Sequence, residues 1–394
     1  MGRRLCALAL VVLGGCGRLR FDVLGHAGGD DVDAASAPGD GPAGDDAPPD
    51  GPSTVGTTIP AGNGPSGVAV GDFNQDGFED IAECNDLGDN VVIFLGDGTG
   101  HFTQGGTFPV GISPGAIIVR DFNGDSHADL AVANLGGNTV SVLLGTGTGS
   151  FATQKTLATG TEPASLTTGD FNRDGKLDLA IAAYNTSPGI VNIALGNADG
   201  TFQTPSSVAT CSTPAGAVMG DFNGDGHDDV ATTCFGAAKM ALMTGNGNAM
   251  FTVSEVTVLA MPQGIAIGDF NGDAKPDLAV ADFGGNAVTV LLGTGTGSFQ
   301  APVSAPGGTA PIAVAVGDFN ADGHSDVAAA NYQTAGTITI AYGNGAGGFP
   351  TSKTLIGGKD PTAIAAGDFN NDGKDDFVVA NYQDNTLTVV LGPM

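Results

Sequence analysis

Short apolar runs alternate with glycine-rich polar turns along most of this 394-residue chain. Residues 114–160 show the pattern clearly, with apolar or β-branched runs at 116–122, 129–134, 139–144 and 151–159. Each run is short and bounded by Gly, Asn or Pro, which is typical of β-strands. The unit has no apolar residues spaced three and four apart, as an amphipathic helix requires. The pattern therefore predicts four strands per unit and an all-β chain.

The same unit recurs seven times, and each copy carries an acidic motif. The aspartate that opens the motif is found at Asp72, Asp121, Asp170, Asp221, Asp269, Asp318 and Asp368. A period of this length that fills a chain indicates a propeller or a solenoid. The first strand of each unit is rich in Ala, Gly, Val and Thr, as strands crowded around a central channel must be. We therefore predict an all-β fold, a seven-bladed β-propeller of four-stranded antiparallel blades.

The two ends of the repeat region predict how the ring closes. The last unit stops after its third strand, at residues 385–394. Thr58–Gly62 aligns with Thr156–Gly160, and each segment ends three residues before a proline. We expect this N-terminal strand to complete the last blade, which would remove strand edges that could pair between molecules. The propeller is assigned to residues 53–394.

The first 52 residues differ from the rest. Residues 1–15 combine two arginines with an apolar run at 5–13, which is too short to span a bilayer and is typical of a secretory signal. Residues 13–16 resemble the lipobox of bacterial lipoproteins, which implies a lipid on Cys16; an ordinary signal with a chance cysteine is the alternative. Residues 16–52 are mostly Asp, Pro, Gly and Ala and predict a disordered acidic tether. These features together predict a secreted, membrane-anchored lipoprotein of the outer membrane or cell surface.

The charge balance limits the classes of partner that the chain can bind. The chain has 42 Asp and Glu against 13 Lys and Arg, a formal net charge of -29. Nucleic acid is excluded as a partner because phosphate binding depends on clustered Lys and Arg. We expect a monomer that meets the membrane only through the N-terminal lipid, and either a cation-loaded or an extracellular protein.

The acidic motifs read Asp-x-Asn-x-Asp-(Gly)-x-x-Asp, with glycine at position six in most units, which places side-chain oxygens at loop positions one, three, five and nine. A backbone carbonyl is available at position seven. Such an oxygen-only set suits Ca²⁺, which takes six to eight oxygens, whereas Mg²⁺ rarely has a dedicated protein cage. An EF-hand would require Glu at position twelve, and only the first unit has one, Glu83. We predict up to seven structural Ca²⁺ ions; solvated acidic turns are the alternative.

The predicted ligands recur in every unit. The side-chain ligands are Asp72, Asn74, Asp76 and Asp80; Asp121, Asn123, Asp125 and Asp129; Asp170, Asn172, Asp174 and Asp178; Asp221, Asn223, Asp225 and Asp229; Asp269, Asn271, Asp273 and Asp277; Asp318, Asn320, Asp322 and Asp326; and Asp368, Asn370, Asp372 and Asp376. The carbonyl ligands are Phe78, His127, Lys176, His227, Lys275, His324 and Lys374. We expect the imidazoles at position seven, and Asp228 at position eight, to face solvent.

The repeated motif, together with the strand pattern that follows it, resembles the FG-GAP/VCBS repeat of integrin α-subunit propellers and many bacterial surface proteins. The resemblance covers residues from about 57 to the end. It implies calcium in the loop that joins the first two strands of a blade. Two units depart from the motif, with Ser126 and Ala274 in place of the glycine at position six, and we expect weaker or distorted binding there.

The residues that follow the second strands gather on the face opposite the calcium loops. They form a candidate ligand face of aromatic residues, which are Tyr184, Phe235, Phe283, Tyr332 and Tyr382. Amides are expected between these rings, at Asn331, Gln333, Asn381 and Gln383. Such a rim suits a sugar or a peptide. The alternative is that the aromatics pack between neighbouring blades.

Three cysteines lie beyond the signal segment. Cys211 precedes the first strand of its unit and Cys234 ends the second strand, so antiparallel pairing brings them to one face and predicts a disulfide. Cys84 is then left as a single buried thiol with no assigned role.

The prediction of function depends on the repeat and on the carboxylates that the repeat assigns to metal binding. We expect an adhesion or interaction module for a protein or glycan ligand. No Ser/His/Asp set stands out, because no histidine occupies a distinct, unrepeated polar context. The alternative is a polysaccharide-degrading lyase or hydrolase, although such enzymes bring clustered basic or histidine residues that this chain lacks.

Overall fold

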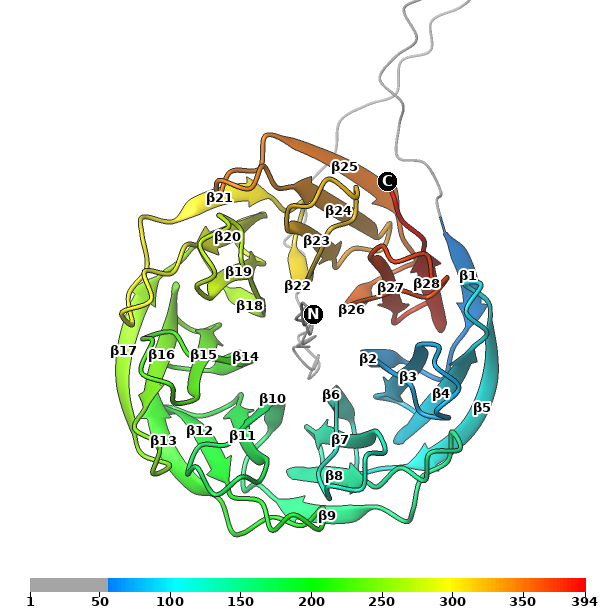
Figure 1. Cartoon of the computed structure of the whole chain (residues 1–394), viewed down its shortest axis with the longest axis horizontal. Helices are drawn as coiled ribbons and strands as arrows, with labels where there is room; N and C mark the ends of the chain where they lie inside the picture. The colour runs from blue at the N-terminus through cyan, green and yellow to red at the C-terminus, as the bar shows by residue number, and fades with distance from the viewer. Residues whose placement is uncertain (1–55) are drawn as a thin grey trace, which may run out of the picture.

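A computed structural model of the chain describes residues 56–394, in which every regular element is a β-strand. The strands form seven four-stranded antiparallel sheets, arranged radially as the blades of a propeller (Figure 1). This confirms the predicted fold class. In this part of the chain, no helix has the length and apolar character needed to cross a bilayer. The predicted signal segment, the tether and Cys16 lie outside the described residues.

Each blade runs from an innermost strand to an outer one. The innermost strands are β2 (Pro65–Gly71), β6 (Pro114–Arg120), β10 (Pro163–Gly169), β14 (Pro214–Gly220), β18 (Pro262–Gly268), β22 (Pro311–Gly317) and β26 (Pro361–Gly367). The second strands are β3 (Asp80–Asn85), β7 (Asp129–Asn134), β11 (Asp178–Ala183), β15 (Asp229–Cys234), β19 (Asp277–Asp282), β23 (Asp326–Asn331) and β27 (Asp376–Asn381). The third strands are β4 (Asn90–Gly96), β8 (Thr139–Leu143), β12 (Gly189–Ala194), β16 (Lys239–Gly245), β20 (Ala287–Leu291), β24 (Thr337–Tyr342) and β28 (Thr386–Val390). The outer strands are β5 (Phe102–Pro109), β9 (Lys155–Ala158), β13 (Ser206–Thr210), β17 (Phe251–Thr257), β21 (Val303–Pro306), β25 (Thr351–Ile356) and β1 (Thr57–Pro60).

The innermost strands begin with proline, which suits their place in the sheets. Proline cannot donate to a strand ladder, and it is tolerated at the first residue of an edge strand. Small side chains follow the proline, and the strands converge toward the centre of the ring (Figure 1). The prediction that one strand per unit lines the centre is therefore confirmed.

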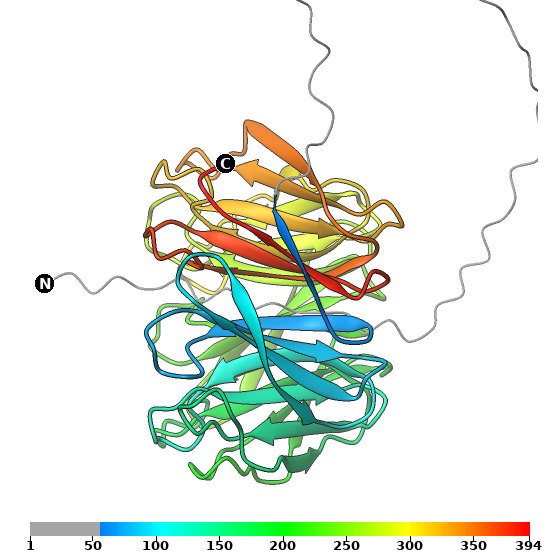
Figure 2. The same cartoon turned by 90° about the vertical axis from the view of Figure 1, so that its right-hand side faces the viewer.

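Strand β1 completes the seventh blade. It pairs antiparallel with β28, from Thr57 opposite Val389 to Pro60 opposite Thr386. Figure 2 shows β1 lying beside β28 although they come from opposite ends of the described chain. Ile59 packs against the apolar cluster between blades seven and one. The first strand of the chain therefore closes the ring, as the alignment predicted.

The hydrophobic core lies between adjacent blades. One cluster, for example, joins Val68 and Ile81 of blade one to Val378 and Leu387 of blade seven. In six of the seven loops the phenylalanine at position two adds to this packing, because it makes an edge-on or tilted contact with a hairpin phenylalanine of the next blade. These pairs are Phe73–Phe151, Phe122–Phe202, Phe171–Phe251, Phe222–Phe299, Phe270–Phe349 and Phe369–Phe102. The seventh, Phe319, contacts Phe377 in strand β27 of the next blade. The repeated motif thus ties each blade to its neighbour.

Candidate functional site

Each acidic loop joins the first and second strands of its blade, so all seven lie on one face of the propeller. The backbone is left-handed at positions four and six in every loop. Glycine adopts this conformation at no steric cost. Ser126 and Ala274, with φ of 67° and 60°, adopt it at position six without that freedom.

Side-chain oxygens hold each loop in its conformation by accepting hydrogen bonds from backbone N–H groups of the same loop, as the fourth loop shows. Asp221 Oδ1 accepts the N–H of Asp225 at 3.2 Å, and its Oδ2 accepts the N–H of Gly226 at 2.9 Å. Asp225 Oδ1 accepts the N–H of His227 at 2.9 Å, and its Oδ2 accepts from Asn223 Nδ2 at 3.0 Å. The three bonds to backbone N–H groups recur in all seven loops. The motif therefore specifies one conformation seven times.

The aspartate at position nine anchors the loop to the blade. Asp229 is fully buried, and its two oxygens accept the N–H groups of Phe222 and Gly245 at 3.0 and 2.7 Å. Burial raises the pKa of Asp229 to about 6, and the charges of Asp225 and Asp221 raise it further. The same pair of bonds is present in every blade. Position nine is thus a structural residue as well as a candidate ligand.

The donor chemistry of the loops fits a hard cation. Each loop gathers three carboxylates and an amide oxygen. In the fourth loop Asp221 Oδ1 already accepts two N–H groups, those of Gly224 and Asp225, whereas Asp221 Oδ2 and both oxygens of Asp229 accept one each and keep a second lone pair. As the side chains stand, however, no three His, Cys, Asp or Glu side chains within residues 56–394 come together to hold a metal ion. Asp225 and Asn223 bond to each other and to the backbone instead. Holding an ion would therefore exchange some of these bonds for metal–oxygen contacts.

The side chains at position seven lie against glycines of the hairpin between the third and fourth strands. A Cβ added at Gly247 would come within 2.8 Å of the His227 imidazole, and one at Gly345 within 2.4 Å of His324. His127 and His227 are half-buried, so the expectation that all three imidazoles face solvent holds only for His324. The cause is the close approach of the hairpin, which the motif alone does not reveal.

We expect Ser126→Gly and Ala274→Gly each to raise the free energy of unfolding by roughly 0.5–1 kcal/mol, because glycine relieves the left-handed strain at position six. Urea unfolding measures the change. Gly226→Ala is the matched control and should lower stability by a similar amount. Equal stability of all three variants and the parent chain would contradict the strain argument.

Acidic residues at position eight connect neighbouring loops. Asp228 accepts the N–H of Asp170 in the preceding blade at 2.7 Å, so the expectation that it faces solvent is wrong. Asp375 and Glu79 do the same for Asp318 and Asp368, both at 2.6 Å. The Glu79 bond bridges the two ends of the ring. These contacts join residues about one repeat apart, or from opposite ends of the chain, and a single motif cannot reveal them.

Glu83, which occupies position twelve, is buried in blade one and bonds to the backbone that follows β1 rather than to its own acidic loop. Its Oε1 accepts the N–H of Gly62 at 2.9 Å, and its buried Oε2 has no hydrogen-bond partner among the described residues. Burial raises the pKa of Glu83 to about 8, although the Gly62 amide and the Asn85 side chain oppose the shift. Gly62 follows β1, so Glu83 lies where the ring closes.

This raised pKa makes stability depend on pH. Between the ordinary pKa of Glu and about 8, the folded chain holds a proton that the unfolded chain releases, so stability falls as pH rises. We expect Glu83→Gln to remove this loss, which amounts to up to roughly 4 kcal/mol between pH 5 and pH 9. Chemical unfolding of both chains across that range measures it. Parallel stability profiles would contradict a buried, proton-holding Glu83.

The aromatic residues of the candidate ligand face are half-buried, and each reaches a neighbouring blade. The rings of Tyr184 and Phe235 lie 6.0 Å apart across the seam between blades three and four. Phe283 and Tyr332 pack against the apolar cluster of blades six and seven. Tyr382 donates to Asp86 of blade one at 2.8 Å. Their packing role is therefore defined by these contacts, and a ligand-binding role stays a prediction.

Two amides predicted on this rim are buried in the blades instead. Asn381 Nδ2 donates to Thr386 and Thr388, and its Oδ1 accepts the N–H of Gly358 at 3.0 Å. Asn331 is also fully buried and donates to Thr337 and Thr339. The last residue of the second strand points into the blade, so its side chain ties the blade together rather than facing a ligand.

The fourth blade has cysteine at this same place. Cys234 ends β15, and Cys211 stands where Gly358 stands in the seventh blade, three residues before the proline of the next strand. The structure pairs the two cysteines as a disulfide with Cα atoms 5.8 Å apart, inside the usual range. Cys84 is a buried free thiol, and burial raises its pKa to about 12.

We expect peptide mapping without reductant to recover Cys211 and Cys234 as one cross-linked pair. The bridge closes a loop of 23 residues, so Cys211→Ser should lower the free energy of unfolding by roughly 3 kcal/mol. Cys84→Ala serves as the control for loss of a cysteine outside the bridge. Two free thiols after aerobic purification would contradict the pairing.

Six overlapping matches to the FG-GAP-like repeat cover residues 72–132, 121–181, 178–232, 221–280, 269–329 and 318–379. Among curated proteins, none matches the chain.

Several solved structures are similar in fold. BBS1N in complex with ARL6DN has a TM-score of 0.60 at 14% identity, covering 85% of this chain and 95% of that one. An Agrocybe aegerita lectin, described for specific recognition of non-reducing terminal N-acetylglucosamine, has a TM-score of 0.51 at 18% identity, covering 84% and 86%. A possible 6-phosphogluconolactonase from Bacteroides uniformis has a TM-score of 0.59 at 14% identity, covering 82% and 90%. At these identities the similarity concerns the fold alone.

Proposed function

The chain belongs to the FG-GAP-like repeat family, and we propose that it is a calcium-stabilised binding module rather than an enzyme. The observation that carries the proposal is the sevenfold repetition of one oxygen-lined loop on one face of a closed ring. In the fourth loop, Asp221, Asn223, Asp225 and Asp229 would hold the ion with the carbonyl of His227. A bound calcium ion would supply the positive charge that offsets repulsion among the three carboxylates.

The proposed ligand is a protein or a glycan. Propellers suit binding because a rigid ring presents its loops and seams in fixed positions, so little ordering accompanies association. The fold shared with a lectin that recognises terminal N-acetylglucosamine supports the glycan option.

A side-by-side screen tests the function. The calcium-loaded chain is applied to a glycan array and a surface-protein library, and separately incubated with a panel of polysaccharides. We expect calcium-dependent binding in the screen and no release of shorter products from the panel. Product release without a binding partner would overturn the module and favour a polysaccharide-degrading enzyme.

We also propose that the chain is displayed at a cell surface through a lipid on Cys16. The support is the short apolar run and the lipobox-like residues 13–16. Expression of the full chain with a radiolabelled fatty acid should label the protein, and Cys16→Ser should abolish the label. An unlabelled chain of reduced mass, found free in the medium, would contradict anchoring and leave an ordinary secretory signal.

A further inference from the structure

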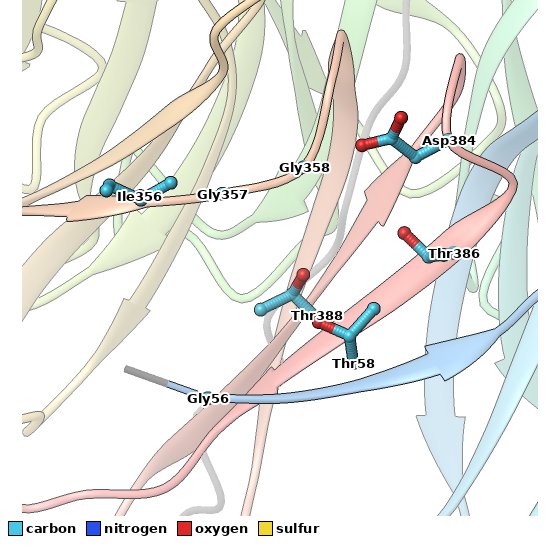
Figure 3. A pocket seen from close by; sticks show the side chains of 8 residues that line it. All are labelled: Gly56, Thr58, Ile356, Gly357, Gly358, Asp384, Thr386 and Thr388. Atoms are coloured by element: carbon cyan, nitrogen blue, oxygen red, sulfur yellow. The ribbon is translucent and has the colours of Figure 1, made fainter. Parts of the chain in front are cut away.

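A groove of about 390 Å³ lies on the seam between blades six and seven (Figure 3). One wall is the end of the outer strand β25, at Ile356, and the two glycines that follow it. The other wall is formed by the third and outer strands of blade seven, β28 and β1, with Asp384 at one end. The volume is within the range of pockets that hold small molecules, roughly 300–1,000 Å³.

Gly357 leaves one wall of the groove without a side chain. The last residue of each outer strand pairs with the first residue of the third strand, and Gly357 is the next residue along the chain in blade six. Val110, Thr159 and Val258 hold the same place in blades one, two and four. Those three side chains are 6–8% exposed and fill their seams. A Cβ on Gly357 would meet no heavy atom closer than 3.5 Å, so a side chain fits there without strain.

Hydroxyl donors line the wall of blade seven. Thr386 and Thr388 each accept a hydrogen bond from Asn381 Nδ2, at 3.2 and 2.9 Å. A hydroxyl oxygen that accepts one bond keeps its own proton and a second lone pair, so both threonines can still donate to a ligand, Thr388 through the 6% of its surface that is exposed. Thr58 on β1 lies opposite Thr388 and is exposed, which adds a third hydroxyl.

An acceptor and an apolar contact complete the lining. Asp384 is held by the N–H of Lys359 at 2.9 Å and by its ammonium at 3.4 Å, which leaves lone pairs on the carboxylate for hydroxyl donors. Ile356 is 42% exposed and offers a C–H surface. The carboxylate disfavours an anionic ligand, because the Lys359 ammonium beside the groove is already paired with it.

We propose that this groove binds a neutral saccharide, a mono- or disaccharide unit, with sugar hydroxyls accepting from the threonines and donating to Asp384. A sugar ring has both hydroxyls and an apolar C–H face, which matches the lining. The assignment rests on the proposed binding function and names its ligand class. It also places the ligand on the outer seam of one blade pair rather than on the aromatic rim.

The test compares the full chain with variants of the groove. The wild-type chain is first applied to an array of neutral, sulfated and uronic-acid glycans, and the best neutral glycan is then titrated calorimetrically. We expect Gly357→Val to weaken binding at least tenfold with an unchanged or higher melting temperature, since it fills the groove as Val110 and Val258 fill theirs. Thr58→Val and Asp384→Asn should each weaken binding several-fold.

A matched control comes from blade two, where Thr156 occupies the register place of Thr58. Thr156→Val should leave the affinity unchanged. Undiminished glycan binding by a folded Gly357→Val chain would overturn the groove and leave the binding module standing. Capture of a surface protein with no neutral glycan bound would overturn the saccharide assignment alone. Failure to bind anything in either screen would overturn both proposals.

Discussion

Removing calcium is expected to lower the melting temperature of this protein by on the order of 10–20 °C. Sites of extracellular modules have Kd values of roughly 10⁻⁴–10⁻³ M. At about 2 mM calcium and the tighter end of that range, each site adds about 1.8 kcal/mol to the free energy of unfolding. Seven such sites contribute on the order of 10 kcal/mol. Calorimetry with calcium and with excess EGTA measures the difference.

Two variants separate calcium binding from the packing of the loop. Asp225→Ala removes an exposed carboxylate together with the bonds that it accepts from His227 and Asn223, so its stability should fall by about 1 kcal/mol in EGTA and further when calcium is present. Asp229→Ala leaves the buried N–H groups of Phe222 and Gly245 unsatisfied, so its stability should fall by roughly 2–6 kcal/mol even in EGTA. If EGTA left the melting temperature of the parent chain unchanged, calcium stabilisation would be contradicted. The loss of stability in Asp229→Ala would still be expected.

Deleting residues 1–62 is expected to destabilise the ring by about 5 kcal/mol and to cause association. The deletion removes the four register pairs between β1 and β28 and the apolar contact of Ile59. It also removes the Gly62 N–H that Glu83 accepts. An unpaired edge on β28 is then open to strands of other molecules. Calorimetry and size-exclusion chromatography measure the two effects.

The control for that deletion is a chain that lacks only residues 1–55 and keeps β1. It should melt and elute as the parent protein does, because β1 still closes the ring. If both truncated chains behaved alike, β1 would contribute nothing to the closure of the ring.

The fold could be predicted because the residue pattern within each repeat is enough to locate the strands of that repeat. Runs such as 129–134 predicted β7 at Asp129–Asn134, and the period of the acidic motif gave seven blades. Ring closure followed from a local comparison, since Thr58–Gly62 matches a complete unit where the last unit lacks its outer strand. Both inferences use order along the chain, which a repeat protein preserves in space.

Contacts between repeats could not be predicted in the same way. The bond from Asp228 to the N–H of Asp170 depends on how two blades meet, as does the half-burial of Tyr184 against Phe235. Burial of Asn381 depends on whether the last residue of β27 faces into the blade or out of it. The alternation of apolar and polar residues gives the end of a strand only to within one residue, so it could not decide this. The groove had a readable signal, because alignment of the repeats sets Gly357 against Val110 and Val258.

Native mass spectrometry of the chain in calcium tests the central claim most directly. The account predicts up to seven bound calcium ions on the parent protein and one fewer on Asp225→Ala, with magnesium giving none at equal concentration. A chain that retains no calcium under these conditions, or one whose count is unchanged by Asp225→Ala, would contradict the assignment of the repeated loops as calcium sites.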